Sequence, residues 1–263
     1  MRRLNPIVFL VVWAAVRPFV FGQTSLSLSP VQIASALAPG KSADHILTIG
    51  NDSQETIRIQ SEVETWRLGK IGIDVFPAEG AAGLTCREWI RIDEREFTLR
   101  AGEQKDIRIT LSVPGDAEPG QYTAAISFKT VSEGADGDPS GGVRVQGKLT
   151  ALAMVTVGKP PPDSGTIEDL TVEKKDGRGV LILRLKNGGR FFLPTEGKLE
   201  IRNEKGKKAC AADILEDPVP PLSERIFSIP LGKKLPPGNY QAECSLRLPT
   251  GKKVTLKKPI VMD

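Results

Sequence analysis

Two copies of the pattern Pro-Gly-x-Tyr, each followed by a strand of alternating apolar and polar residues, constrain this sequence more than any other feature. The first copy starts at Pro119 and leads into residues 122–128, and the second starts at Pro237 and leads into residues 240–248. A Pro-Gly turn re-aims the chain between sheets, and the tyrosine after it can hydrogen-bond back to the turn, as in the tyrosine corner of immunoglobulin-like sandwiches. The repeat therefore predicts two tandem Greek-key sandwiches.

The rest of the chain follows the same period of two. Residues 107–113 alternate without error between apolar and polar side chains, and residues 180–185 and 225–230 form similar short runs. Gly, Pro, Asn and Asp separate these runs, and helical periodicity is nearly absent, as strands and turns require. The predicted fold class is all-β, with two tandem immunoglobulin-like β-sandwich domains after a signal peptide.

The N-terminus reads as a secretory signal peptide. A basic start at Arg2 and Arg3 precedes an apolar stretch, residues 7–16, and cleavage is expected after Gly22. The stretch is shorter than the ~20 residues that span a bilayer, so we expect no stable membrane insertion after cleavage. Localisation to the periplasm, or secretion to the cell envelope, follows. The predicted divisions are residues 1–22 (signal peptide), 23–158 (first immunoglobulin-fold domain), 159–165 (Pro-rich linker) and 166–263 (second sandwich domain).

Charge differs between the two predicted domains. Residues 23–158 hold 13 Lys and Arg and 18 Asp and Glu, a net of −5, whereas residues 166–263 hold 19 and 13, a net of +6. The halves could attract each other across an interdomain cleft, meet different partners, or simply be two solvated surfaces. The sequence pI of about 8.9 owes part of its value to the signal peptide, so no nucleic-acid partner is predicted.

No constellation of residues predicts catalysis. The single histidine, His45, lies beside Asp44 in a strand, where neighbouring side chains point to opposite faces. We therefore predict a non-enzyme without catalytic, cofactor-binding or metal-binding residues, and without a cofactor. Cys210 and Cys244 could form a disulfide within the second domain, leaving Cys86 free, or could remain buried thiols.

The last strand of the first domain, Val143 to Val157, stands out because it is apolar on both faces from Leu149 onward. Either its outer face packs against the second domain, which would bury Leu152 and Met154 there, or the strand offers a free edge to a partner by β-strand addition. The candidate partner-binding residues are Arg144, Lys148, Leu149, Ala151, Leu152, Ala153, Met154 and Val155.

Four lysine pairs mark the second domain: residues 207–208, 233–234, 252–253 and 257–258. Neighbours on a strand point to opposite faces, so the pairs do not make one patch by sequence alone. They could line a basic rim that contacts glycans or other anionic surfaces, or could keep exposed strand edges from aggregating.

Residues 25–157 resemble the PapD-like periplasmic chaperones of chaperone–usher pilus assembly. The resemblance rests on Leu26-x-Leu28-x-Pro30, Asn51, Trp89-Ile90, Phe97-x-Leu99-x-Ala101-Gly102 and Val113-Pro114…Pro119-Gly120-x-Tyr122. It implies a periplasmic protein that binds rather than catalyses. It also implies that Val143 to Val157 completes the sandwich of an unfinished pilus subunit, and that basic residues in the interdomain cleft, with Arg144 or Lys148 among them, hold the subunit's C-terminal carboxylate.

The leading hypothesis is a periplasmic chaperone-like protein that binds exported or pilus-type subunits through the edge strand Val143 to Val157. The alternative is a structural or adhesive cell-envelope module whose lysines contact glycans or anionic surfaces. The sequence leaves the oligomeric state open.

Overall fold

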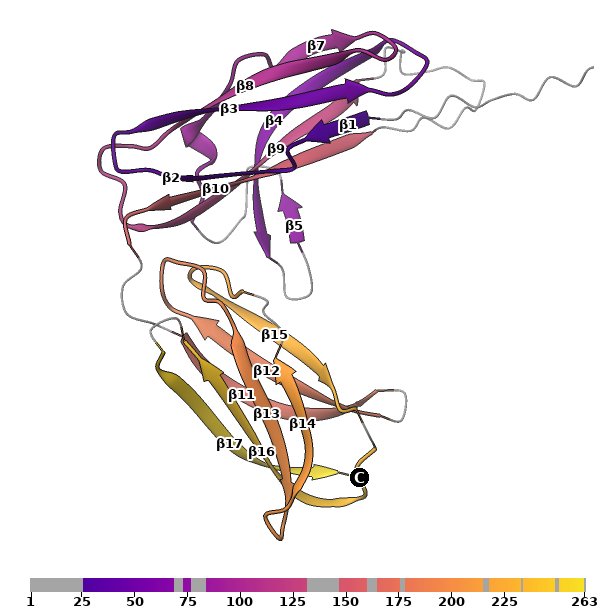
Figure 1. Ribbon diagram of the computed structural model, residues 1–263, viewed down its shortest axis with the longest axis vertical. Coiled ribbons are helices and arrows are strands. Elements are labelled where there is room, and N and C mark those ends of the chain that lie inside the picture. Colours follow the sequence, from indigo (N-terminus) through magenta and orange to yellow (C-terminus); the bar gives the residue numbers. More distant parts are fainter. Residues whose placement is uncertain are drawn as a thin grey trace, which may run out of the picture.

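The chain folds into two β-sandwiches in tandem, drawn one above the other in Figure 1. The computed structural model describes residues 26–68, 73–76, 84–131, 147–159, 165–175, 178–214, 218–232, 234–248 and 251–262. The predicted signal peptide and most of the predicted linker lie outside these residues. Within them the only helical element is a single 3-10 turn, η1 (Arg87–Trp89), and no helix is long and apolar enough to cross a membrane. The all-β prediction is confirmed.

The N-terminal sandwich contains two sheets, with strand orders β1-β3-β8-β6 and β2-β10-β9-β4-β5; β7 also pairs with β4. The strands of the first sheet are β1 (Leu26–Ser29), β3 (Ser42–Asn51), β8 (Gln104–Ser112) and β6 (Ile90–Ile92). Those of the second are β2 (Gln32–Ala36), β10 (Lys148–Val157), β9 (Gly120–Val131), β4 (Ile57–Leu68), β5 (Ile73–Phe76) and β7 (Glu96–Leu99).

The C-terminal sandwich pairs a three-stranded sheet with a four-stranded one, in the orders β11-β12-β15 and β14-β13-β16-β17. Its strands are β11 (Gly165–Lys175), β12 (Arg178–Asn187), β15 (Ser223–Pro230), β14 (Lys208–Ile214), β13 (Glu196–Asn203), β16 (Gly238–Arg247) and β17 (Lys253–Met262). Each sandwich has its own core, because the apolar side chains of its alternating strands meet between its two sheets.

The alternation of apolar and polar residues in the sequence predicts which side chains form these cores. Ile107, Ile109 and Leu111 of β8 are all at most 1% exposed, while the residues between them face solvent. On β9, Ile126 and Phe128 are fully buried against them. A strand with a period of two buries one face of the sheet, so the sequence pattern was sufficient to assign the inward residues.

A tyrosine corner forms in both sandwiches, as the repeated Pro-Gly-x-Tyr pattern predicts. Tyr122 Oη donates a hydrogen bond to the carbonyl of Glu118 at 2.8 Å, and Tyr240 Oη donates to the carbonyl of Pro236 at 2.9 Å. Each bond ties the start of a long core strand (β9 or β16) to the turn that precedes it.

In each sandwich a buried asparagine side chain donates hydrogen bonds to three backbone carbonyls. Asn51 Nδ2 donates to the carbonyls of residues 55, 99 and 100 at 2.7–3.1 Å. Asn187 Nδ2 donates to those of residues 191, 219 and 220 at 2.7–3.0 Å. Both side chains are at most 2% exposed. Because buried carbonyls require a donor, each amide helps to satisfy the backbone of two segments that lie far apart in the sequence.

The cysteines do not form the disulfide that the sequence allowed. Cys86, Cys210 and Cys244 are all buried free thiols. Cys210 pairs with Ile201 of β13 and Cys244 with Leu199 of the same strand, so β13 lies between the two cysteines. Two strand spacings amount to about 9.5 Å, beyond the reach of a disulfide. Burial also raises the pKa of the Cys244 thiol to about 12, which keeps it protonated.

Candidate partner-binding edge

The strand β10 supplies every described residue of the predicted partner-binding set, and its two faces differ. Ala151, Ala153 and Val155 point into the core of the N-terminal sandwich and are fully buried. Their side chains therefore contact the chain's own core and not a partner. Arg144 lies outside the described residues.

The structure corrects the expectation that all of β10 has a free edge. Strand β2 pairs with β10 in parallel, from Leu152 opposite Gln32 to Thr156 opposite Ala36. No strand was predicted for residues 32–36, so this pairing was missed. In the structure the chain leaves the first sheet at Pro30 and joins the second as β2, with Ile33 buried in the core. A pairing between residues 120 positions apart leaves no local signal.

Two environments were predicted for Leu152 and Met154: burial against the second domain, or a position beside a free strand edge. Neither is observed. Both are partly buried on the outer face of the second sheet, opposite Ala125 and Thr123 of β9. The edge beside them belongs to β2, so they do not stand next to a free edge.

One stretch of β10 remains open. Among the described residues, no strand pairs with Lys148–Ala151 on the side opposite β9. On the same side of the sandwich, β1 is the edge strand of the first sheet. In the part of the chain that the structure describes, both sheets therefore end here without a further neighbour. We call this region, β1 together with Lys148–Ala151, the open seam.

The open seam exposes part of the core. Leu26 and Leu28 of β1 are only partly buried, although both pack against the core cluster, and Leu149 of β10 is also partly exposed. Val31, where the chain crosses between the sheets, is 63% exposed, and its carbonyl accepts the Leu152 N–H at 2.9 Å. Partly exposed apolar side chains thus lie between the edge of β1 and the part of β10 that no described strand pairs with.

A buried carboxylate fixes the start of β10. Glu64 of β4, whose side chain is 5% exposed, accepts a hydrogen bond from Ser127 of β9 and pairs with Lys148 Nζ at 2.5 Å. Ser127 Oγ also lies 3.0 Å from Thr150 Oγ1. Burial alone would raise the pKa of Glu64, but the hydrogen bonds from Lys148 and Ser127 outweigh it and hold this pKa below its usual range. The cluster therefore joins three strands and sets the register of the open part of β10.

The junction between the sandwiches is built on Arg190, which the sequence did not single out. Its guanidinium donates to the carbonyl of Pro119 and to Tyr122 Oη, both at 3.0 Å, and pairs with Glu118 at 3.0 Å. Its backbone carbonyl accepts the Gln121 N–H at 2.8 Å. The tyrosine corner of the first sandwich thus also docks the second one. Nothing in the sequence near Arg190 could indicate partners about 70 residues away.

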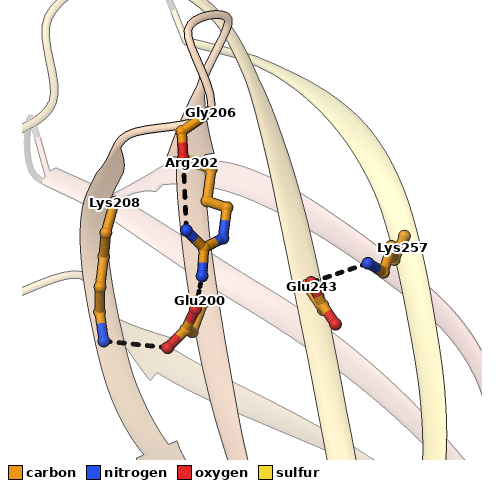
Figure 2. A network of polar contacts seen from close by, with 6 residues as sticks. All are labelled: Glu200, Arg202, Gly206, Lys208, Glu243 and Lys257. Carbon is orange, nitrogen blue, oxygen red and sulfur yellow. Dashed lines mark hydrogen bonds and ion pairs between the residues drawn. The ribbon is translucent and has the colours of Figure 1, made fainter.

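Three lysines of the predicted pairs, Lys208, Lys257 and Lys258, form ion pairs with carboxylates. Figure 2 shows Lys208 and Arg202 paired with Glu200 at 3.0 and 2.5 Å, and Lys257 paired with Glu243 at 3.1 Å, on the outer face of the four-stranded sheet. The hydrogen bond from Lys208 is the main reason that the pKa of Glu200 is lowered. Glu200 and Glu243 oppose each other on neighbouring strands, and the surrounding cations offset the repulsion between them.

Lys258 points to the opposite side of β17 from Lys257 and pairs with Asp169 of β11 at 2.5 Å. This bond is the main cause of the lowered pKa of Asp169. Adjacent lysines thus serve two different faces, as strand geometry predicts. Across the described part of the chain, no group of three or more His, Cys, Asp or Glu side chains is placed to hold a metal ion.

The lone histidine has a structural contact. His45 Nε2 lies 2.8 Å from Ser35 Oγ, so the side chain joins β3 of one sheet to β2 of the other. Asp44 faces the other way and accepts a hydrogen bond from Thr110 at 2.8 Å.

No protein-family model and no curated protein matches the sequence. Among solved structures, the chain is similar to one from a chaperone–tip adhesin complex of CFA/I fimbriae biogenesis (12% identity, TM-score 0.48, covering 91% of this chain and 100% of that one). It is also similar to the E. coli chaperone DraB (16%, 0.42, 91% and 98%). A third similar chain comes from the Salmonella enterica SafA pilin in complex with the SafB chaperone (17%, 0.41, 91% and 96%). The likeness extends over both sandwiches.

Proposed function

We propose that this protein is a periplasmic, non-catalytic, chaperone-like binder that holds exported polypeptides, pilus-type subunits among them, by adding one of their strands to the open seam. The single observation that carries the proposal is that, among the described residues, both sheets of the N-terminal sandwich end on the same side, beside a partly exposed core. A sandwich that is unfinished along one side is suited to accept a strand from another chain.

The backbone of β10 supplies the hydrogen bonds for such a strand. The Leu152 N–H points toward β2, because it donates to the Val31 carbonyl. Since backbone groups alternate along a strand, the N–H and carbonyl of Thr150 point to the same side, where no described strand pairs with them. The open stretch of four residues is about 13 Å long. A short backbone ladder of this kind binds many sequences and releases them readily, as a chaperone must.

The side chains of the seam add a preference for apolar strands. A strand beside Lys148–Ala151 would place alternate side chains over Leu26, Leu28 and Leu149, which are partly exposed without it. Burial of this surface is favourable at about 25 cal/mol per Å². The alternative, a glycan-binding rim, has less support, because Lys208, Lys257 and Lys258 are already ion-paired.

A charge placed beside the open edge is expected to abolish capture of the partner. Val31→Lys changes a residue that is 63% exposed, so the fold should be affected by less than about 0.5 kcal/mol. An incoming strand would then have to desolvate the ammonium, and we expect binding to weaken about tenfold or more. The measurement is affinity capture from envelope extract, with the captured protein identified and then purified for titration.

Three further variants separate the edge from the surface around it. Thr150→Pro removes the N–H that faces the open edge together with the hydroxyl that lies 3.0 Å from Ser127 Oγ, and Thr150→Val is its control because it removes the same hydroxyl but keeps the N–H. Val261→Lys charges an equally exposed residue (66%) of the other sandwich. The proposal requires loss of binding in Val31→Lys and Thr150→Pro alone. A partner captured equally well by all four proteins would remove the seam from consideration.

A further inference from the structure

The turn before β15 carries an apolar residue where the first sandwich has glycine. Asn51 and Asn187 bind equivalent carbonyls, those of residues 99–100 and 219–220, so Gly102 and Leu222 occupy the same position of the repeated fold. Both have a left-handed backbone, with φ of +72° at Gly102 and +52° at Leu222. Among the described residues, Leu222 is the only non-glycine residue with positive φ.

Leucine at this position strains the backbone. Its Cβ crowds the following carbonyl in the left-handed region, whereas glycine adopts that region without strain. The side chain gains little from its own fold in return, because it is 51% exposed. A residue that is both strained and exposed indicates a contact made with something other than its own core.

The loop holds the leucine in a fixed orientation. It reads Pro218-Val219-Pro220-Pro221-Leu222, and proline restricts its backbone. The Leu222 N–H donates to the Gly189 carbonyl at 3.0 Å, and Ser223 Oγ donates to the Pro220 carbonyl at 2.9 Å. Arg225 adds a hydrogen bond to the Pro218 carbonyl at 3.0 Å. A side chain presented on so constrained a loop loses little entropy when a partner covers it.

Leu222 stands at the end of the C-terminal sandwich that faces the N-terminal one. Its N–H partner, Gly189, precedes Arg190, which binds Pro119 and Tyr122 across the junction. In Figure 1, β15 begins at this end, directly after Leu222. The open seam begins farther away. From Thr150 to Val157, where β10 approaches the junction, the strand covers about 23 Å.

We infer that Leu222 is a second anchor for the same partner, and that this partner is a polypeptide of domain size whose apolar surface reaches the junction while one of its strands occupies the open seam. This inference rests on the proposed function. A compact domain of 100 residues has a radius of gyration of about 13 Å, so its diameter exceeds the distance of about 23 Å between Thr150 and Val157, whereas a strand of only four residues, about 13 Å long, does not reach that far.

The test uses the full-length exported protein with the photoreactive amino acid benzoylphenylalanine at position 222. The same amino acid at position 261, which is equally exposed on the C-terminal sandwich, is the control. After irradiation in cells, the expected product joins position 222 to the protein whose capture Val31→Lys abolishes. Position 261 should give no such product.

The variant Leu222→Asn supplies the second measurement, because asparagine accepts the left-handed backbone but lacks the apolar side chain. We expect its melting temperature to stay equal or to rise by up to about 3 °C. Binding of the purified full-length partner should weaken about fivefold or more, while a synthetic peptide of the partner's seam strand should bind both proteins equally.

Two outcomes overturn the inference while the proposed function stands: a cross-link from position 222 only to this chain or to a second copy, or unchanged partner affinity in Leu222→Asn. A melting temperature lowered by several degrees would also overturn it, because Leu222 would then support its own fold. If no protein is captured through the seam, or if position 222 joins a protein indifferent to Val31→Lys, both proposals fail.

Discussion

Replacing Asn187 by alanine is expected to lower the free energy of unfolding of the C-terminal sandwich by about 2–4 kcal/mol. The amide donates to three buried carbonyls at 2.7–3.0 Å and is 2% exposed. Without it, the Phe191 carbonyl and the Gly189 N–H lose their partner, at about 1–3 kcal/mol for each unsatisfied group. The carbonyls of Val219 and Pro220 keep the Leu193 N–H and Ser223 Oγ as donors, and the shortened side chain leaves a cavity that adds to the loss. The measurement is urea unfolding followed by far-ultraviolet circular dichroism.

Tryptophan fluorescence gives this experiment an internal reference. In protein produced without residues 1–22, the tryptophans left are Trp66 and Trp89, both in the N-terminal sandwich. The fluorescence transition should therefore move far less than the dichroism transition. Asn239→Ala is the matched control, because the exposed Asn239 amide bonds only the Glu204 carboxylate. A dichroism transition equal to that of the control would show that the buried amide contributes nothing.

Replacing Lys148 by methionine is expected to destabilise the N-terminal sandwich by about 1–3 kcal/mol at neutral pH. The change leaves the Glu64 carboxylate buried with only Ser127 as its donor. Removal of one partner from a fully buried pair costs more, but Lys148 is 36% exposed, so solvent screens part of the interaction. Lys129→Met is the control, because its partner Glu62 is 38% exposed, and a loss below about 1 kcal/mol is expected there.

The pH dependence of this difference has a definite sign. In the wild type the pKa of Glu64 is lowered, so its contribution is present above the ordinary value of 4.5 and is lost as the pH falls through the folded-state pKa. In Lys148→Met we expect burial to dominate and to raise the pKa of Glu64. As the pH falls, Glu64 of the variant takes up a proton, and the free-energy cost of its buried charge disappears. The two stabilities should therefore converge in acid. A difference that stays constant from pH 7 to pH 4 would contradict the role given to Glu64.

Local pattern was enough to predict most of the fold. The period of two in residues 107–113 assigns the buried face of β8, because a strand with one buried face can be built in only one way. The two Pro-Gly-x-Tyr turns predicted tandem sandwiches, because each tyrosine binds a carbonyl four residues away. Both signals are contained in short stretches of sequence.

The candidate site was harder to predict because it depends on distant partners. The pairing with β2 determines which part of β10 stays exposed, and β2 lies more than 110 residues earlier in the chain, where no strand was predicted. The pairing of Lys148 with Glu64 and the junction at Arg190 also join segments far apart in sequence. The sequence therefore pointed to β10 as the candidate strand, but not to the four residues of it that no described strand pairs with on the side opposite β9.

Amide hydrogen exchange at Thr150 tests the central claim most directly. The purified protein would be measured by NMR with and without the purified partner identified by capture. The account predicts that the Thr150 amide, which faces the open edge, becomes strongly protected in the complex. The Leu152 amide, which already donates to Val31, should change little. Protection that appears elsewhere, with Thr150 exchanging at the same rate in both states, would show that the partner does not add a strand to β10.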